Sequence, residues 1–134
     1  MFDADPMLSQ NGGLAIGVFA ELKGLYELHQ QGGSLDWYDV VMPVSEIAKS
    51  WRISAELDAI LKTDEISGYL RSGQYPELSA IYVSTEGNIK SEGDLIEQET
   101  LSNTLKQIAL HGSDYIYSTM ATVLSQEIQD NGGI

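Results

Sequence analysis

The sequence has 20 carboxylate side chains, and four of them follow one another with no base between. These four acids are Glu92, Asp94, Glu97 and Glu99. Neighbouring carboxylates can work as general acid and base, or they can attract a cationic partner. Acids at the start of a helix also stabilise the positive end of its dipole. We therefore interpret the four acids as a surface patch and not as a catalytic pair.

The other reactive residue types offer little catalytic chemistry. The sequence has no cysteine, which excludes disulfides, thiolate zinc sites, iron–sulfur clusters and cysteine nucleophiles. The two histidines, His29 and His111, are far apart in sequence and leave little room for a histidine metal site. Gly12, Gly13 and Gly17 lack the lysine and hydroxyl of a phosphate-binding loop. We expect no enzyme, no metal and no cofactor.

The 134 residues carry 20 acids and 7 bases, for a net charge of −13. Five of the bases lie between residues 44 and 90, so both ends of the chain are strongly anionic. Such a charge repels nucleic acids and anionic membranes. It favours a protein partner with a basic surface, and the residues that we assign to this partner are Glu92, Asp94, Glu97, Glu99, Glu56 and Asp58.

No stretch approaches the roughly 20 apolar residues that a membrane-spanning helix needs. The first residues also lack the basic region of a signal peptide. These two observations predict a cytoplasmic protein.

The elements that must position these side chains are mostly helical. We expect a flexible leader over residues 1–13 and a single domain over residues 14–134, which begins with a helix over 14–31. The further predicted elements are a strand over 35–41, a helix over 44–52, helices capped by Ser54 and at Thr63–Asp64, strands over 79–84 and 89–92, a helix over 95–111 whose start is capped by Asp94 and Glu97, and a helix over 114–129.

This order of elements resembles the winged helix-turn-helix family over about residues 14–92. The segment 44–61 resembles the helix-turn-helix itself, with Ala48 where the helices cross and with buried positions at Ile47, Trp51, Ile53 and Leu61. It departs from that pattern at Arg52 and Asp58. The resemblance implies a mainly α (α+β) fold: a winged-helix-like core, a β-hairpin at about 79–92, and a C-terminal helical extension over 94–130. A roadblock-type domain could begin with the same hairpin and helix, but no strands follow to complete one.

Two functions fit this fold. Such domains read DNA with the second helix, and the alternative function is therefore a dimeric DNA-binding transcriptional regulator. Its nucleic-acid contacts would be Lys49, Arg52, Ser54, Lys62 and Lys90. The net charge instead favours an acidic, non-catalytic protein-interaction module of the inhibitor, nucleic-acid-mimic or adaptor type.

The last predicted helix has one apolar side and one uncharged polar side. An apolar side of this kind is typical of a helix that packs against another surface. We expect the protein to form a homodimer through this side, and the residues assigned to the dimer interface are Ile116, Met120, Val123, Leu124 and Ile128.

Overall fold

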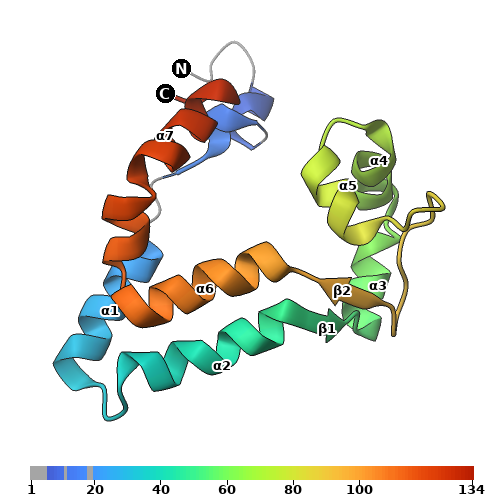
Figure 1. The fold of residues 1–134 in the computed structure, drawn as a ribbon. Coiled ribbons are helices and arrows are strands. Elements are labelled where there is room, and N and C mark those ends of the chain that lie inside the picture. The colour runs from blue at the N-terminus through green and yellow to red at the C-terminus, as the bar shows by residue number, and fades with distance from the viewer. Residues whose placement is uncertain (1–5, 11, 18–19) are drawn as a thin grey trace. The chain divides into compact units, whose positions relative to one another are not determined.

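A computed structural model describes residues 6–10, 12–17 and 20–134 of the chain (Figure 1). Residues 1–5 and Asn11 of the predicted leader lie outside the described residues, as do Val18 and Phe19 of the first predicted helix. The elements are η1 (Pro6–Ser9), η2 (Gly13–Ala15), α1 (Glu21–Gly32), α2 (Trp37–Lys49), β1 (Ser50–Arg52), α3 (Ala55–Leu61), α4 (Asp64–Ser72), α5 (Pro76–Tyr82), β2 (Leu95–Glu97), α6 (Glu99–His111), the π-helix η3 (Tyr115–Thr119) and α7 (Ala121–Asp130).

The chain divides into two compact units. The first unit comprises Met1–Val41 and Gln107–Ile134, and the second comprises Met42–Lys106. None of the described helices is long and apolar enough to cross a membrane.

The first unit is organised around Trp37, at the start of α2. The indole N–H of Trp37 donates a hydrogen bond to the carbonyl oxygen of Ile108 in α6, at 2.9 Å. Two rings from α1 pack edge-on against the indole, with centroid distances of 4.9 Å for Tyr26 and 5.3 Å for His29. The rings and the hydrogen bond hold α1 against the start of α2 and the end of α6.

The predicted strand over 35–41 is wrong, because these residues begin α2. The better-covered positions along this helix are Trp37, Val41, Ser45 and Ala48, and spacings of three and four residues are those of an α-helix. Pro43 lies inside α2, on its exposed side, instead of starting a new helix. The residues of this segment that favour β structure therefore form helix, because one helical side contacts the rest of the fold.

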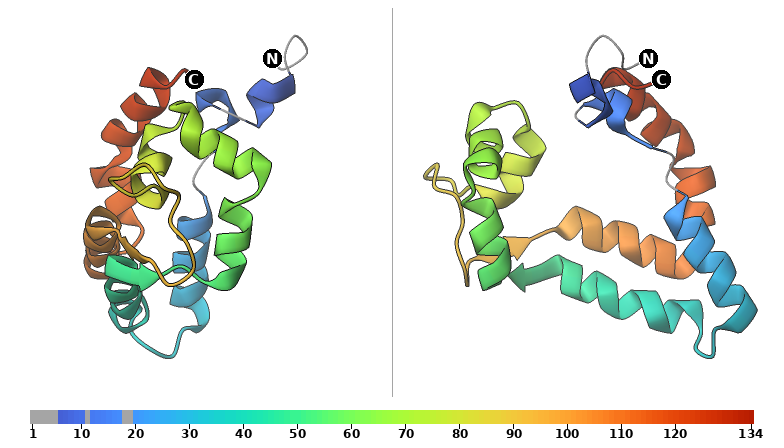
Figure 2. Two further views of the ribbon diagram at one scale, coloured as in Figure 1. Left: turned by 90° about the vertical axis from the view of Figure 1, so that its right-hand side faces the viewer. Right: turned by 180° about the vertical axis from the view of Figure 1, so that it is seen from behind.

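The second unit contains a two-stranded antiparallel sheet, visible in Figures 1 and 2, that sequence patterns did not predict. Its register pairs Ser50 with Glu97, Trp51 with Ile96, and Arg52 with Leu95. The predicted helix-turn-helix is therefore wrong, since a strand and not a turn separates the end of α2 from α3.

The core of the second unit lies beside this sheet. Its buried apolar side chains come from β2, from α3 and α4, and from the link between β1 and α3; they are Ile53, Leu61, Leu70 and Ile96. Two of the buried positions predicted from the helix-turn-helix resemblance are confirmed, Ile53 and Leu61. A third is wrong, because Ile47 is 65% exposed.

Local capping chemistry in the second unit follows the sequence closely. The Ser54 hydroxyl accepts the backbone N–H of Leu57 at 3.3 Å, and the Thr63 hydroxyl accepts that of Ile66 at 3.4 Å. These bonds satisfy N–H groups that a helix start leaves without partners. Both predicted caps are confirmed.

The predicted hairpin at about 79–92 is largely wrong. Its first strand is the helix α5, which begins at Pro76; proline suits the first turn of a helix because it has no N–H to satisfy. What remains of a hairpin is a single antiparallel bridge between Val83 and Ile89. The predicted strand over 89–92 contributes no more than this bridge.

The two C-terminal helices agree better with their predictions. α6 begins at Glu99 because residues 95–97 form β2, and the Asp94 carboxylate accepts the N–H of Ser91 at 2.7 Å instead of capping a helix. The predicted helix over 114–129 is confirmed as η3 followed by α7. The mainly helical class is also confirmed.

Candidate functional site

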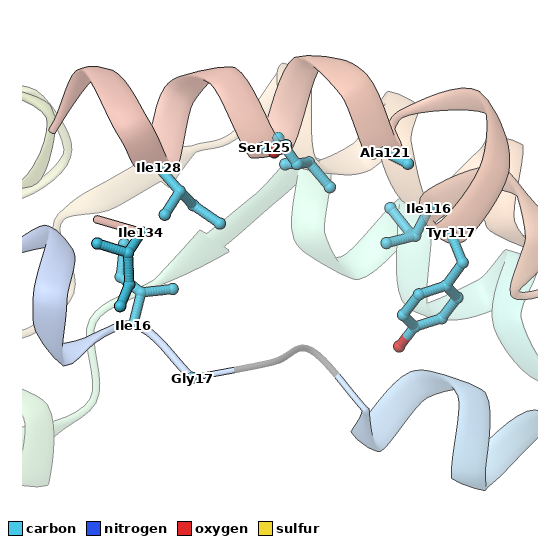
Figure 3. Close-up of a pocket in the computed structure, with 9 residues that line it drawn as sticks. Ile16, Gly17, Ile116, Tyr117, Ala121, Ser125, Ile128 and Ile134 are labelled. Atoms are coloured by element: carbon cyan, nitrogen blue, oxygen red, sulfur yellow. The ribbon is translucent and has the colours of Figure 1, made fainter. Parts of the chain in front are cut away.

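An open groove of about 360 Å³ lies in the first unit, between α7 and the segment that follows η2. Figure 3 shows Ile16, Ile128 and Ile134 together at one end, and Ile116 and Tyr117 at the other. The remaining lining residues are Gly17, Ala121, Leu124 and Ser125. None of the described residues that line this groove has a charged side chain, although the chain carries a net charge of −13.

One end of the groove is formed by two glycine-rich segments, residues 12–13 and residues 131–133, and backbone hydrogen bonds fix their positions. The N–H of Gly13 donates to the carbonyl of Asn131 at 3.2 Å, and the N–H of Gly133 donates to the carbonyl of Ile128 at 2.8 Å. A Cβ atom on Gly13 would collide with the Asn131 carbonyl, so the close approach requires glycine. The segment before Ile16 is therefore tied to the C-terminal end of α7.

The opposite end of the groove is tied to α1. The Tyr117 hydroxyl accepts a hydrogen bond from the backbone N–H of Lys23 at 3.2 Å. The Lys23 ammonium lies 3.0 Å from the Glu27 carboxylate and 3.8 Å from that of Asp114. The hydrogen bond with Glu27 raises the pKa of Lys23 above its ordinary value.

Three residues assigned to a dimer interface, Ile116, Leu124 and Ile128, line this groove and face other parts of the same unit. The other two do not line it: Met120 is half-buried, and Val123 is 48% exposed on another side of α7. The homodimer and the cytoplasmic location both stay predictions.

The sequence patterns do not indicate that Ile16, Gly17 and Ile134 line this groove. The predicted helix over 14–31 includes Ile16 and Gly17, whereas both residues lie outside any helix, and a Cβ built on Gly17 meets no atom within 4 Å. The available signal was the repeated Asn-Gly-Gly at 11–13 and 131–133, which marks two places where the backbone can be approached closely.

A second hollow, of about 800 Å³, lies in the second unit beside β2 and the start of α6. It is lined by acidic, basic and amide side chains together with small and apolar ones: Ala80, Ile81, Lys90, Glu97, Gln98, Glu99, Thr100, Leu101 and Thr104. The amide oxygen of Gln98 already accepts the indole N–H of Trp51 at 3.1 Å. This hollow is therefore lined both by Glu97 and Glu99, which were assigned to a basic partner, and by Lys90, which was assigned to nucleic acid.

The cations assigned to nucleic acid each contact an oxygen atom of this chain. Lys49 lies 3.7 Å from Glu99, and Lys62 donates to Asp58 at 2.7 Å. Arg52 donates to the carbonyl of residue 93 at 2.6 Å, and Lys90 donates to that of residue 95 at 3.1 Å. Ser54 is the cap of α3. Each of the five residues therefore has a hydrogen-bond or charge partner within the second unit.

Of the six acids assigned to a basic partner, Asp58 is half-buried and the other five are exposed. Asp94 accepts from Ser91, Glu99 lies near Lys49, and Asp58 accepts from Lys62. The hydrogen bond from Lys62 lowers the pKa of Asp58, and one from the Ser54 hydroxyl lowers that of Glu56. The structure does not gather these acids into one patch free of cations.

Neither histidine is placed as a catalytic base. Both ring nitrogens of His29 are buried and have no hydrogen-bond partner, and the ring packs against Trp37. His111 stacks on Tyr115 with ring centroids 6.4 Å apart. Among the residues that the structure describes, no three His, Asp or Glu side chains gather as a metal site.

Comparison with known proteins identifies relatives across the whole chain. Residues 1–134 match the family described as Gamma-glutamyltranspeptidase. The chain is 35% identical over 137 residues to Scoloptoxin SSD14 of Scolopendra dehaani, an alignment that covers 100% of this chain and 23% of the relative. It is 31% identical over 136 residues to Glutathione hydrolase proenzyme 2 of Schizosaccharomyces pombe, which covers 100% of this chain and 22% of that protein.

The fold agrees with these matches. The crystal structure of Helicobacter pylori gamma-Glutamyltranspeptidase superposes with a TM-score of 0.83 and 27% identity, over 96% of this chain and 36% of that chain. The chain spans about a quarter of the length of the curated relatives named above.

These matches correct the predicted family and function. The resemblance to winged helix-turn-helix domains is wrong, because both the sequence relatives and the solved fold are of another family. The acidic, non-catalytic module of the inhibitor or nucleic-acid-mimic type is wrong as well, and so is the DNA-binding regulator. The prediction of no enzyme is wrong, because this is a family of enzymes that includes glutathione hydrolases.

Proposed function

Because the chain belongs to the gamma-glutamyltranspeptidase family, we propose that it is part of an enzyme that hydrolyses glutathione. In that reaction water adds across the γ-glutamyl amide bond and releases glutamate and cysteinylglycine. The match of the whole chain to this family carries the proposal. It is supported by the 31% identity to a glutathione hydrolase proenzyme over the whole chain.

Within this enzyme we assign the chain a supporting role. A hydroxyl nucleophile needs a base within hydrogen-bond distance. Two of the three fully buried serines, Ser102 and Ser113, have a hydroxyl without a hydrogen-bond partner, and the buried ring nitrogens of His29 have none either. The groups that do interact, such as Trp37 and Ile108, join helices. The described residues thus fit a structural role. They would support the rest of the enzyme, which makes up about three-quarters of the length of the relatives.

A chimera tests this function. The matching stretch of the S. pombe proenzyme is replaced by residues 1–134, and glutamate release from glutathione is measured. We expect activity within about tenfold of the parent enzyme, since the chain has the same fold as the segment it replaces. The matched control carries a shuffled sequence of the same composition in that stretch, and it should be inactive.

A chimera that is folded by circular dichroism but releases no glutamate would contradict the proposal. The same assay on the chain by itself should give no glutamate release, because the supporting role needs the rest of the fold. Glutamate release by the isolated chain would contradict that role.

A further inference from the structure

We infer that Asn131 is a site of spontaneous deamidation, and that the reaction loosens the contact between residues 12–13 and the end of α7. Asn131 directly follows α7 and is itself followed by Gly132. The backbone nitrogen of Gly132 attacks the side-chain amide carbon of Asn131, and a cyclic imide forms as ammonia leaves with the proton of that nitrogen. Water then opens the imide to aspartate or isoaspartate. Neither step requires the proposed enzymatic reaction.

The residue after Asn131 leaves the attacking nitrogen accessible. Gly132 is exposed, and a Cβ built on it meets no atom within 4 Å. Asn131 is exposed as well, but so are Asn88 and Asn103. Each of those two asparagines is followed by a β-branched residue, whose side chain crowds the nitrogen that would attack. The absence of a side chain on Gly132 therefore distinguishes Asn131 from the other asparagines that the structure describes.

Two hydrogen bonds at the end of α7 control how fast the reaction can occur. The N–H of Gly132 donates to the carbonyl of Gln129 at 2.9 Å, and the side-chain amide of Asn131 donates to the carbonyl of Glu127 at 2.8 Å. Both bonds must break before the nitrogen can reach the amide carbon. The last turn of a helix frays at little cost in free energy. The reaction therefore starts from the frayed end of α7, and it is slower in the folded chain than in the unfolded one.

The isoaspartate product does not fit the place that Asn131 occupies. It lengthens the backbone before Gly132 by a methylene group, and it turns the former backbone carbonyl of residue 131 into a free carboxylate. That carbonyl accepts the N–H of Gly13 at 3.2 Å. Even a Cβ on Gly13 would collide with this carbonyl and with the nitrogen of Gly133, so the contact has no space for an added atom.

The charge of the product acts in the same direction. Deamidation places a carboxylate at the C-terminal end of α7, where the helix dipole disfavours negative charge. Asp130 is adjacent in sequence and already carries such a charge. The lengthened backbone and the added charge should both move residues 131–133 away from Gly13.

Mass spectrometry of the aged 134-residue chain tests whether Asn131 reacts. The chain is incubated at neutral pH in water enriched in oxygen-18, so that isotope uptake marks each asparagine that has deamidated. Every sample carries Asn11→Gln, which removes the other Asn-Gly pair of the sequence. Asn88 and Asn103 in the same chain are the controls, and a parallel incubation in urea gives the rates in the unfolded chain.

We expect Asn131 to react at least about tenfold faster than Asn88 and Asn103 in the folded chain, and at least about twofold more slowly there than in urea. Equal rates at the three asparagines of the folded chain would overturn the inference. A rate at Asn131 that is no higher in urea would contradict the control by the two hydrogen bonds.

Hydrogen exchange tests whether the contact loosens. The amide of Gly13 should exchange at least about tenfold faster once residue 131 is isoaspartate. Asn131→Asp is the matched control, because it adds the charge without lengthening the backbone, and it should raise this exchange rate by a smaller factor. Asn131→Gln forms the cyclic imide far more slowly, so its Gly13 amide should exchange equally fast before and after incubation. Unchanged exchange at Gly13 in the isoaspartate form, or faster exchange in incubated Asn131→Gln, would overturn the loosening.

Discussion

The indole N–H of Trp37 lies 2.9 Å from the carbonyl oxygen of Ile108, and this hydrogen bond joins residues 71 positions apart. The bond connects the start of α2 with the end of α6 at a point where Ile108 is 6% exposed. The Tyr26 and His29 rings of α1 pack on the same indole. One side chain therefore holds three helices of the first unit together.

Trp37→Phe should destabilise the chain by about 1–2 kcal/mol, because it removes the indole hydrogen bond and part of the ring contact, while the Ile108 carbonyl still accepts the backbone N–H of Gly112. The phenyl ring keeps part of the contact with Tyr26. Urea unfolding followed by circular dichroism measures the change. Tyr38→Phe is the control, since Tyr38 is 45% exposed and should change stability by less than about 0.5 kcal/mol. An equal effect of the two substitutions would contradict the role of the indole.

Two glycines of the first unit should respond to alanine in opposite directions. Gly24 lies inside α1, and a Cβ built on it meets no atom within 4 Å. Gly24→Ala should therefore stabilise the chain by about 0.5–1 kcal/mol, because alanine loses less backbone entropy in a helix.

Gly112 has a φ of +68°, and a Cβ there would lie 2.8 Å from the Tyr26 ring. Gly112→Ala should cost about 1–3 kcal/mol, since the left-handed backbone is strained for alanine and the ring must move. Melting temperatures of the two variants in one buffer give the comparison. A rise in both, or a fall in both, would contradict it.

Ile96 is the most completely buried of the core residues described in the second unit. It is fully buried at the centre of β2, whereas its neighbour Leu95 is 41% exposed. Ile96→Ala should destabilise the chain by about 2–5 kcal/mol through lost burial and the cavity left behind. Leu95→Ala should cost about 1 kcal/mol or less. Hydrogen exchange of the amides of α3 and α4 should rise in the first variant and not in the second.

Asp58 should make the stability of the chain depend on pH. The hydrogen bond from Lys62 holds its pKa below the ordinary value, so the folded chain favours the carboxylate more than the unfolded chain does. This contribution is complete above the unfolded value of about 3.9 and is lost as the pH falls through the lower folded value. The stability difference between the wild type and Asp58→Asn should therefore shrink as the pH falls from 7 to 3, in urea unfolding at each pH.

Lys62→Gln provides the control for this prediction. It removes the donor and should return the pKa of Asp58 toward its ordinary value, measured by NMR titration of the carboxyl carbon. An unchanged titration would show that Lys62 is not the cause.

The features that the sequence determined by itself are those decided within a few residues. Ser54 and Thr63 cap helices because each hydroxyl reaches an N–H three residues further on, and no distant partner is needed. The last helix was predictable for the same reason, since its apolar residues recur with a helical period. The absence of cysteine likewise excluded thiol chemistry without any structure.

Tertiary structure decided the features that depend on distant partners. Residues 35–41 and 79–84 are short runs compatible with strand or helix, and packing of one helical side around Trp37 and the proline start at Pro76 favoured helix. β1 forms because residues 50–52 meet residues 95–97, a pairing that neither segment encodes separately. The groove exists because two glycine-rich segments about 120 positions apart approach each other closely, and only the folded chain brings them together.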